Sequence, residues 1–152
     1  MRARLHALLA ALWGGFLLCV ALAAAPSAFA ALERTVAGLY VGRLFSVEAE
    51  VSLAAALLAI LFERRHARDA LDASRPVPAL SAELLLAAAA LFCTVAGYYA
   101  LQPLMAQARA GTGVASFAAL HGVSLGFFGL KGLAVLALAW RLMSRLSPGA
   151  AS

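Results

Sequence analysis

The sequence has little charge, and this shortage is its most informative property. Charged residues make up 12% of the 152 residues, hydrophobic residues make up 64%, and lysine occurs only at Lys131. The mean hydropathy is +0.93. Because a soluble domain is about 45–50% apolar and about 25% charged, this chain cannot cover a water-facing surface. The composition therefore predicts an all-α, polytopic membrane protein whose main partner is the lipid bilayer.

Cysteine is also scarce, since only Cys19 and Cys93 are present, and both lie inside apolar runs. Two such residues do not make the disulfide framework of a small secreted domain. Buried lone cysteines usually behave as small hydrophobic residues. A soft-metal site shared by the two thiols is the alternative.

Catalytic and nucleotide-binding signatures are missing as well. The sequence has no Walker loop, no order of serine, histidine and aspartate typical of a catalytic triad, and no H-E-x-x-H motif. Of the three histidines, His6 and His66 lie on the cytoplasmic side of the expected membrane and His121 lies in its outer leaflet. This separation excludes a haem held by His6 and His121. The net charge of +5 comes without an aromatic-rich basic stretch, so we expect no nucleic-acid partner. We also expect no cofactor and no metal.

What the chain does contain is a set of long apolar runs. A bilayer core of about 30 Å needs helices of about 20 residues, and four of them use most of the chain. We therefore expect one transmembrane domain, residues 1–152, that forms a four-helix bundle. The expected helices are residues 5–31, 45–62, 80–101 and 115–140. Between them we expect a polar link at residues 33–43, a break at Pro76 and Pro78, and a loop at residues 111–113.

The first run has an alternative interpretation as a signal peptide. It begins with a basic segment and ends in Ala28-Phe29-Ala30, which has the form of a cleavage site. Its apolar stretch of about 21 residues is longer than the roughly 7–15 residues of a signal peptide. We therefore interpret it as a retained helix with Pro26 near its outer end.

The arginines predict the orientation of the bundle. Eight fall on one side of the expected membrane: Arg2, Arg4, Arg64, Arg65, Arg68, Arg75, Arg141 and Arg145. Three fall on the other side: Arg34, Arg43 and Arg109. Because cytoplasmic loops carry the excess of basic residues, the pattern predicts a bacterial inner-membrane protein with both its N-terminus and its C-terminus in the cytoplasm.

The last run carries a candidate intramembrane polar face. His121, Ser124 and Lys131 recur at helical spacing, and a lysine at mid-membrane costs roughly 2.5–3.5 kcal/mol on insertion scales. Such a face should point into the bundle, because lipid offers no hydrogen-bond partner. There it either contacts an ion, a proton or a ligand, or forms a lysine–carboxylate pair that fixes the helix register.

Four residues are candidate partners for this face: Glu48, Glu50, Glu83 and Tyr98. A rise of about 1.5 Å per residue places Glu50 about 10 Å from Lys131 along the membrane normal, and Glu83 somewhat nearer. Two long side chains can close either gap. Glu48 lies about half a helical turn from Glu50, so it is expected to face elsewhere. Tyr98 also fits an aromatic belt at the outer interface.

Small residues recur at four-residue spacing, which indicates that the chain associates with another membrane helix. Gly38 is followed by Gly42, and Gly122 is followed by Gly126. Such spacing lets helices approach closely in lipid. A second copy of the chain or another membrane protein is therefore a candidate partner.

Three segments also match a known pattern in order along the chain. They are Gly14-Gly15-Phe16 leading to Ala25-Pro26-Ser27-Ala28-Phe29, then residues 37–45, and finally residues 117–124 with the core Leu120-His121-Gly122-Val123-Ser124. Together they resemble the membrane domain of unknown function that bacterial proteins share with transmembrane protein 205. The resemblance implies a four-helix membrane domain with no established reaction. It also implies that Pro26 is a motif residue of the mature protein, which argues against a cleaved signal peptide. Members often carry an asparagine soon after the serine, whereas this chain has Phe127-Phe128, which puts a polar role of this helix in doubt.

Two classes of function follow from these observations. The first is a non-enzymatic membrane protein, transporter-like or an accessory subunit, that uses the face of His121 and Lys131. The alternative is a small membrane redox or cofactor-binding enzyme. The first is favoured because the chain offers no convincing pair of cofactor ligands. A haem absorption band from the purified protein would reverse that order.

Overall fold

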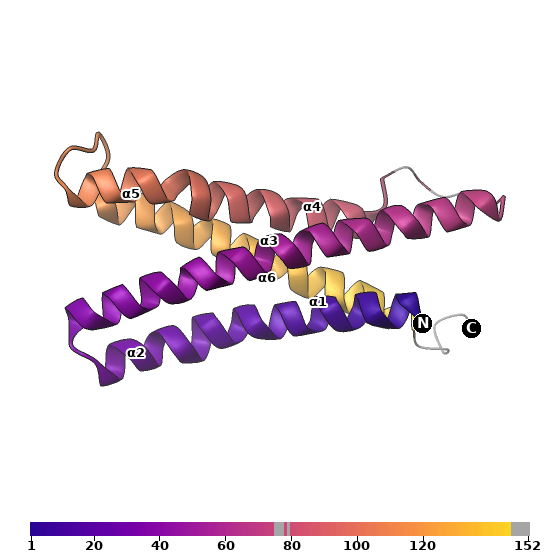
Figure 1. Ribbon diagram of the computed structural model, residues 1–152, viewed down its shortest axis with the longest axis horizontal. Helices are drawn as coiled ribbons and strands as arrows, with labels where there is room; N and C mark the ends of the chain where they lie inside the picture. Colours follow the sequence, from indigo (N-terminus) through magenta and orange to yellow (C-terminus); the bar gives the residue numbers. More distant parts are fainter. Residues whose placement is uncertain (75–77, 79, 147–152) are drawn as a thin grey trace.

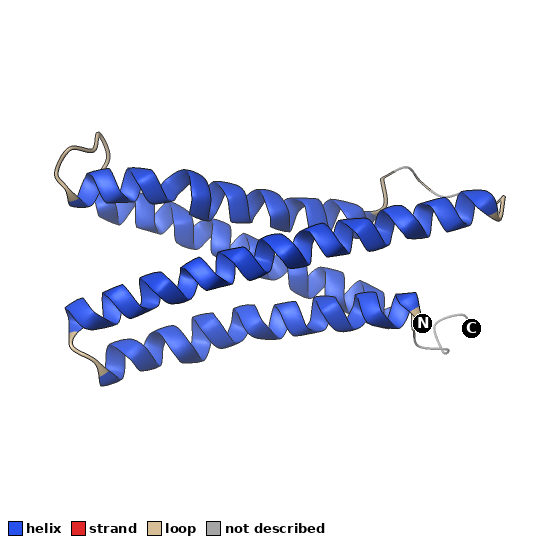
Figure 2. Ribbon diagram, viewed as in Figure 1, coloured by secondary structure: helices blue, strands red, loops and turns tan. Residues whose placement is uncertain are grey.

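The computed structural model describes residues 1–74, 78 and 80–146, and all regular structure in these residues is helical (Figure 1, Figure 2). The elements are α1 (Arg2–Cys19), η1 (Val20–Ala24), α2 (Ala25–Ala31), α3 (Arg34–Asp72), α4 (Ala82–Thr94), η2 (Val95–Ala100), α5 (Leu101–Arg109) and α6 (Phe117–Ser144). They join into 4 continuous segments of the described chain that are long and apolar enough to cross a membrane. The predicted all-α fold with four membrane-spanning helices is confirmed.

The second segment is longer than its hydrophobic pattern predicts. The polar link predicted at residues 33–43 is wrong, because α3 begins at Arg34. Nothing in this stretch breaks a helix, and the Glu33 side chain accepts a hydrogen bond from the backbone nitrogen of Thr35 at 3.0 Å, which caps the new helix. The helix continues to Asp72. The break predicted at Pro76 lies outside the described residues.

Serine residues begin the third and fourth segments. Ser81 is the N-cap of α4 and accepts a hydrogen bond from the backbone nitrogen of Leu84 at 3.1 Å. Ser116 is the N-cap of α6 and accepts one from Ala119 at 3.2 Å. Each serine satisfies a backbone donor that the first helical turn leaves unpaired, so the helices begin within two residues of their predicted starts.

Two π-helical segments, η1 and η2, each end just before a proline. η1 ends at Ala24, ahead of Pro26, and η2 ends at Ala100, ahead of Pro103. Proline lacks a backbone donor and its ring clashes with the preceding turn, and a wider π turn relieves this conflict inside a membrane helix. The third segment therefore continues through Pro103 to Arg109 instead of ending at the predicted residue 101.

The bundle has a well-packed half and a divided half. We call the end where α1 begins and α6 ends the terminal end, and the opposite end the loop end. In the terminal half α1 packs against α3 and α6, and α4 packs against the same two helices. The core there joins Ala10, Ala59, Ala87 and Leu138, one from each long segment. Small residues let the four backbones approach closely.

In the half nearest the loop end, the helices separate into two hairpins. α2 packs against α3, and α5 packs against α6. Figure 1 shows α3 and α6 crossing near the middle of the bundle and the two hairpins diverging beyond the crossing. The paired glycines Gly38, Gly42, Gly122 and Gly126 face open space in this half. Their predicted role in helix association stays a prediction.

Candidate functional site

An ion pair between α3 and α6 lies where these two helices cross. The ammonium nitrogen of Lys131 is 2.6 Å from Oε1 of Glu48. Only 3% of Lys131 and 1% of Glu48 is exposed. α3 and α6 stand at diagonal positions in the bundle, with α1 and α4 between them, so the pair bridges the bundle axis. An ion pair removed from water in this way is held by its mutual attraction and its hydrogen bonds.

Two further side chains connect this pair to α1. The Ser52 hydroxyl donates to Oε1 of Glu48, and the indole nitrogen of Trp13 donates to the Ser52 oxygen at 2.9 Å. Both side chains are buried. We call Trp13, Ser52, Glu48 and Lys131 the central network. It satisfies the polar groups of three helices at a depth where lipid could not.

An aromatic pair covers the central network on the side of the loop end. Phe45 precedes Glu48 by one helical turn, and Phe128 precedes Lys131 by one turn. Their rings meet edge to face with 5.4 Å between centroids. The Lys131 nitrogen also lies 4.9 Å from the centre of the Phe128 ring, a distance at which the ring attracts the cation. The two phenylalanines therefore stand between the ion pair and the diverging hairpins.

Glu48 is the carboxylate that meets Lys131, and the depth estimate pointed to Glu50 or Glu83 instead. The buried face of α3 runs through Glu48, Ser52, Ala55, Ala59 and Glu63, which recur at helical spacing. Glu50 lies on the opposite face and is exposed. The estimate counted depth along the membrane normal, but the crossing of α3 over α6 decides which side chains converge.

The other residues of the predicted polar face have separate partners. His121 is exposed and stacks on Phe117, with 5.6 Å between ring centroids. The Ser124 hydroxyl donates to the backbone oxygen of Gly97 in η2 at 2.7 Å. His121 precedes Lys131 by ten residues, which rotates it by roughly 80° around the helix. The same ten residues correspond to a rise of about 15 Å toward the loop end, so His121 lies away from the ion pair.

Tyr98 does not reach the central network. It is half-buried, and its ring meets that of Tyr99 edge to face at 5.2 Å. The aromatic-belt interpretation of this pair stays a prediction.

A second group of buried polar residues lies at the terminal end. Glu83 is 1% exposed and pairs with Arg141 and Arg145, each at 2.8 Å. Glu63 of α3 accepts a hydrogen bond from Ser81 at 2.7 Å and lies 3.5 Å from Nδ1 of His6. We call Glu83, Arg141, Arg145, Glu63, His6 and Ser81 the terminal cluster.

Several of these residues were absent from the sequence-based candidates, although two signals could have found them. Trp13 lies in the middle of its membrane segment instead of at an interface, and a buried indole needs a hydrogen-bond acceptor. The small and polar residues Ser52, Ala55 and Ala59 follow Glu48 on one face of α3, and such a stripe indicates an interior face in lipid. The terminal cluster gives no comparable pattern.

The two cysteines lie in different surroundings. Cys19 is exposed, Cys93 is buried, and both are free thiols. Among the residues described by the structure, no group of three or more histidine, cysteine or acidic side chains is arranged to hold a metal ion. The acidic and basic groups that do converge pair with one another.

A helical bundle with apolar segments of membrane-spanning length and a charged pair shielded at its centre defines an integral membrane protein. The family described as a domain of unknown function, DUF4149, matches residues 8–114. The chain therefore belongs to this family. Neither the comparison with curated proteins nor the comparison with solved structures gives a match.

Proposed function

We propose that this chain is a transporter-like protein of the bacterial inner membrane whose mobile element is the crossing of α3 and α6. The observation that carries the proposal is the ion pair of Glu48 and Lys131, 2.6 Å apart and shielded at the point where the hairpins diverge. Charged groups inside a membrane are expensive and commonly mark ion or substrate pathways. A pair at a crossing point can couple its own charge state to the separation of the helices.

The proposed mechanism has two states. With both groups charged, the pair draws α3 and α6 together on the terminal-end side of Phe45 and Phe128. When a proton moves onto Glu48, or an ion or substrate replaces one partner, the attraction across the axis is lost. The hairpins then change their separation at the loop end, while the close-packed alanine core keeps the terminal half fixed. A ligand shifts such an equilibrium only by its differential affinity for the two states.

Distances between spin labels test this mechanism without knowledge of the substrate. One label pair, at Leu39 and Val123, reports the loop end, and both positions are exposed. A matched pair at Arg68 and Met143 reports the terminal end, in a background where both cysteines are replaced by alanine. We expect the loop-end distance distribution to change in Glu48→Gln and to stay unchanged in Glu50→Gln, whose side chain is exposed. A loop-end distribution that is unaffected by Glu48→Gln would contradict the transporter-like function.

The proposed orientation has the terminal end in the cytoplasm. The described arginines at this end are Arg2, Arg4, Arg64, Arg65, Arg68, Arg141 and Arg145, against Arg34, Arg43 and Arg109 at the loop end, and this asymmetry supports the proposal. A reporter fused after Ser152 should be active in the cytoplasm, and one inserted at Gly111 should be active outside it. A periplasmic C-terminus would contradict the orientation. An N-terminal tag retained in the mature protein would exclude the signal peptide.

We further propose that the likeness to transmembrane protein 205 reflects a shared membrane domain. Residues 14–29 and 37–45 fall within the matched range of 8–114, whereas residues 117–124 lie beyond it. A carboxylate–lysine pair between the corresponding helices of such a protein would support this relationship. The alternative function, a small redox or cofactor-binding enzyme, predicts a haem or flavin absorption band in the purified protein.

A further inference from the structure

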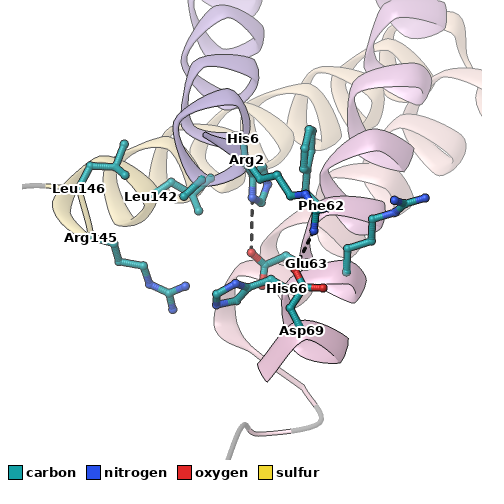
Figure 3. Close-up of a pocket in the computed structure, with 11 residues that line it drawn as sticks. Arg2, His6, Phe62, Glu63, His66, Asp69, Leu142, Arg145 and Leu146 are labelled. Atoms are coloured by element: carbon teal, nitrogen blue, oxygen red, sulfur yellow. Dashed lines mark hydrogen bonds and ion pairs between the residues drawn. The ribbon is translucent and has the colours of Figure 1, made fainter. Parts of the chain in front are cut away.

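The terminal end holds a pocket of about 260 Å³ between the start of α1, the C-terminal part of α3 and the end of α6 (Figure 3). Phe62, Leu142 and Leu146 line it together with the charged residues Arg2 and Arg145. Several lining residues are exposed, so the pocket reaches the surface of the bundle. Its volume falls below the roughly 300–1,000 Å³ of drug-sized ligand sites, and it is of the size of a small ion or a single headgroup.

The guanidinium groups in the pocket have donors to spare. Arg2 contacts Asp69 through Nη1 at 2.8 Å, and Arg145 contacts Glu83 through Nη2 at 2.8 Å. Each contact uses one nitrogen, whereas a guanidinium carries five N–H donors. The side chains of Arg2 and Arg145 are 66% and 50% exposed. Their remaining donors are therefore accessible to an anion, and guanidinium groups match phosphate oxygens well.

His6 provides an independent indication of a ligand. It is 4% exposed, and its Nε2 atom has no hydrogen-bond partner among the residues that the structure describes. Figure 3 shows its ring reaching from α1 toward Glu63 of α3, whose Oε1 lies 3.5 Å from Nδ1. A buried polar atom without a partner is rare in native proteins. In the imidazolium form Nδ1 donates to the carboxylate, and the N–H of Nε2 is the donor left for an anionic group in the pocket.

The carboxylates of the pocket already have polar partners. Asp69 accepts from Arg2, and Glu63 accepts from Ser81 and faces His6. Beyond the pocket, Arg4 and Arg68 add positive charge at the same end of the bundle. The surroundings therefore favour an anion, and the apolar residues at the pocket wall suit the acyl-chain side of a lipid.

We propose that this pocket binds a phosphate-type group, held by Arg2, Arg145 and Nε2 of His6. The group belongs either to an anionic lipid headgroup or to a small soluble phosphate. The proposal is independent of any transport by the chain, because it rests on the terminal end alone.

Native mass spectrometry of the delipidated protein tests the lipid source. The two probes are phosphatidic acid and diacylglycerol with identical acyl chains, which differ only in the phosphate. Inorganic phosphate and glycerol 3-phosphate, measured by calorimetry in phosphate-free buffer, test the soluble source. We expect the wild-type protein to prefer phosphatidic acid over diacylglycerol by at least about tenfold, a difference within the range of charge-assisted hydrogen bonds.

Matched variants identify the site. Arg2→Gln and Arg145→Gln should each reduce phosphate-dependent binding by about tenfold. The His6 ring stacks on Phe62 with 5.2 Å between ring centroids. His6→Phe keeps a ring in this stack and should reduce binding because it removes Nε2. Arg68→Gln removes one positive charge at the same end, outside the pocket, and should leave binding nearly unchanged.

Each outcome decides the proposal. Loss of binding in Arg2→Gln and Arg145→Gln with retention in Arg68→Gln supports it, and binding of the soluble probes alone identifies a soluble ligand. Equal retention of both lipids without binding of soluble phosphate would overturn it. An equal loss in Arg68→Gln would also overturn it, because binding would then depend on general charge. Arg2 is mostly exposed, so its variant remains informative if His6→Phe fails to fold.

Discussion

The central network and the terminal cluster both contain a buried carboxylate, yet they hold it in different ways. Glu48 has a single cationic partner, Lys131, which is itself 3% exposed. Glu83 is as deeply buried, but its two partners, Arg141 and Arg145, have side chains 49% and 50% exposed. At the terminal end a lost partner can be replaced by the other arginine or by water. At the centre nothing can replace it.

This difference predicts how the two sites respond to substitution. Removing one member of a buried pair leaves an uncompensated charge and costs about 3–5 kcal/mol, whereas exposed pairs contribute about 0–1 kcal/mol. The terminal pairs lie between these limits because the arginine heads contact water. The central network should therefore govern the stability of the bundle, and the terminal cluster should govern its interaction with ligands.

The largest effect is expected for Lys131→Met. The substitution strands the Glu48 carboxylate, so unfolding in detergent should become easier by about 3 kcal/mol. The loss should be smaller at acidic than at alkaline pH, because a stranded carboxylate is relieved by taking up a proton. The measurement is thermal unfolding of the purified protein across pH. If the Lys131→Met variant melts at the wild-type temperature at alkaline pH, the lysine forms no ion pair on which stability depends.

A smaller effect is expected for Trp13→Phe. The phenyl ring keeps most of the apolar contacts and removes the donor that binds the Ser52 oxygen at 2.9 Å. The expected loss is about 1 kcal/mol, the usual value of one hydrogen bond. Trp140→Phe is the matched control, since Trp140 is 71% exposed and its substitution should change the unfolding temperature little. Equal losses of stability from both substitutions would show that the Trp13 hydrogen bond does not stabilise the central network.

The smallest single effect is expected for Arg145→Gln. Arg141 continues to pair with Glu83 at 2.8 Å, so the loss should stay below about 1 kcal/mol. Substituting both arginines should cost more than the sum of the single losses, because each one compensates for the other. Additive losses in the double variant would show that the two arginines act independently.

The sequence was sufficient for the elements of the fold and insufficient for their crossing. Apolar runs fixed the four membrane segments, because their length is set by the bilayer. The start of α3 at Arg34 was missed, since the polar residues around Glu33 and Arg43 resemble a loop by composition although none of them breaks a helix. The π turns before Pro26 and Pro103 were missed because a single proline in an apolar run indicates an end or a kink equally well.

For the site, the sequence identified Lys131 and included Glu48 among its candidates, but could not choose the pair. Depth along the membrane normal is a one-dimensional measure, and it favoured Glu50 and Glu83. The choice depends on the rotation of α3 and on its crossing with α6. The rotation could have been read from the face of Glu48, Ser52 and Ala59. The crossing arises from packing of all four helices and leaves no local pattern.

The central claim is that Glu48 and Lys131 form one coupled pair, and a double-mutant cycle tests it most directly. The variants are Lys131→Met, Glu48→Gln and their combination, with Glu50→Gln as the control two positions away on the exposed face of α3. The measurement is the free energy of unfolding in detergent at alkaline pH. The account predicts that Glu48→Gln restores most of the stability lost in Lys131→Met, because the neutral pair leaves no stranded charge, while Glu50→Gln restores none. Additive losses for Lys131 and Glu48, or rescue by Glu50→Gln, would contradict it.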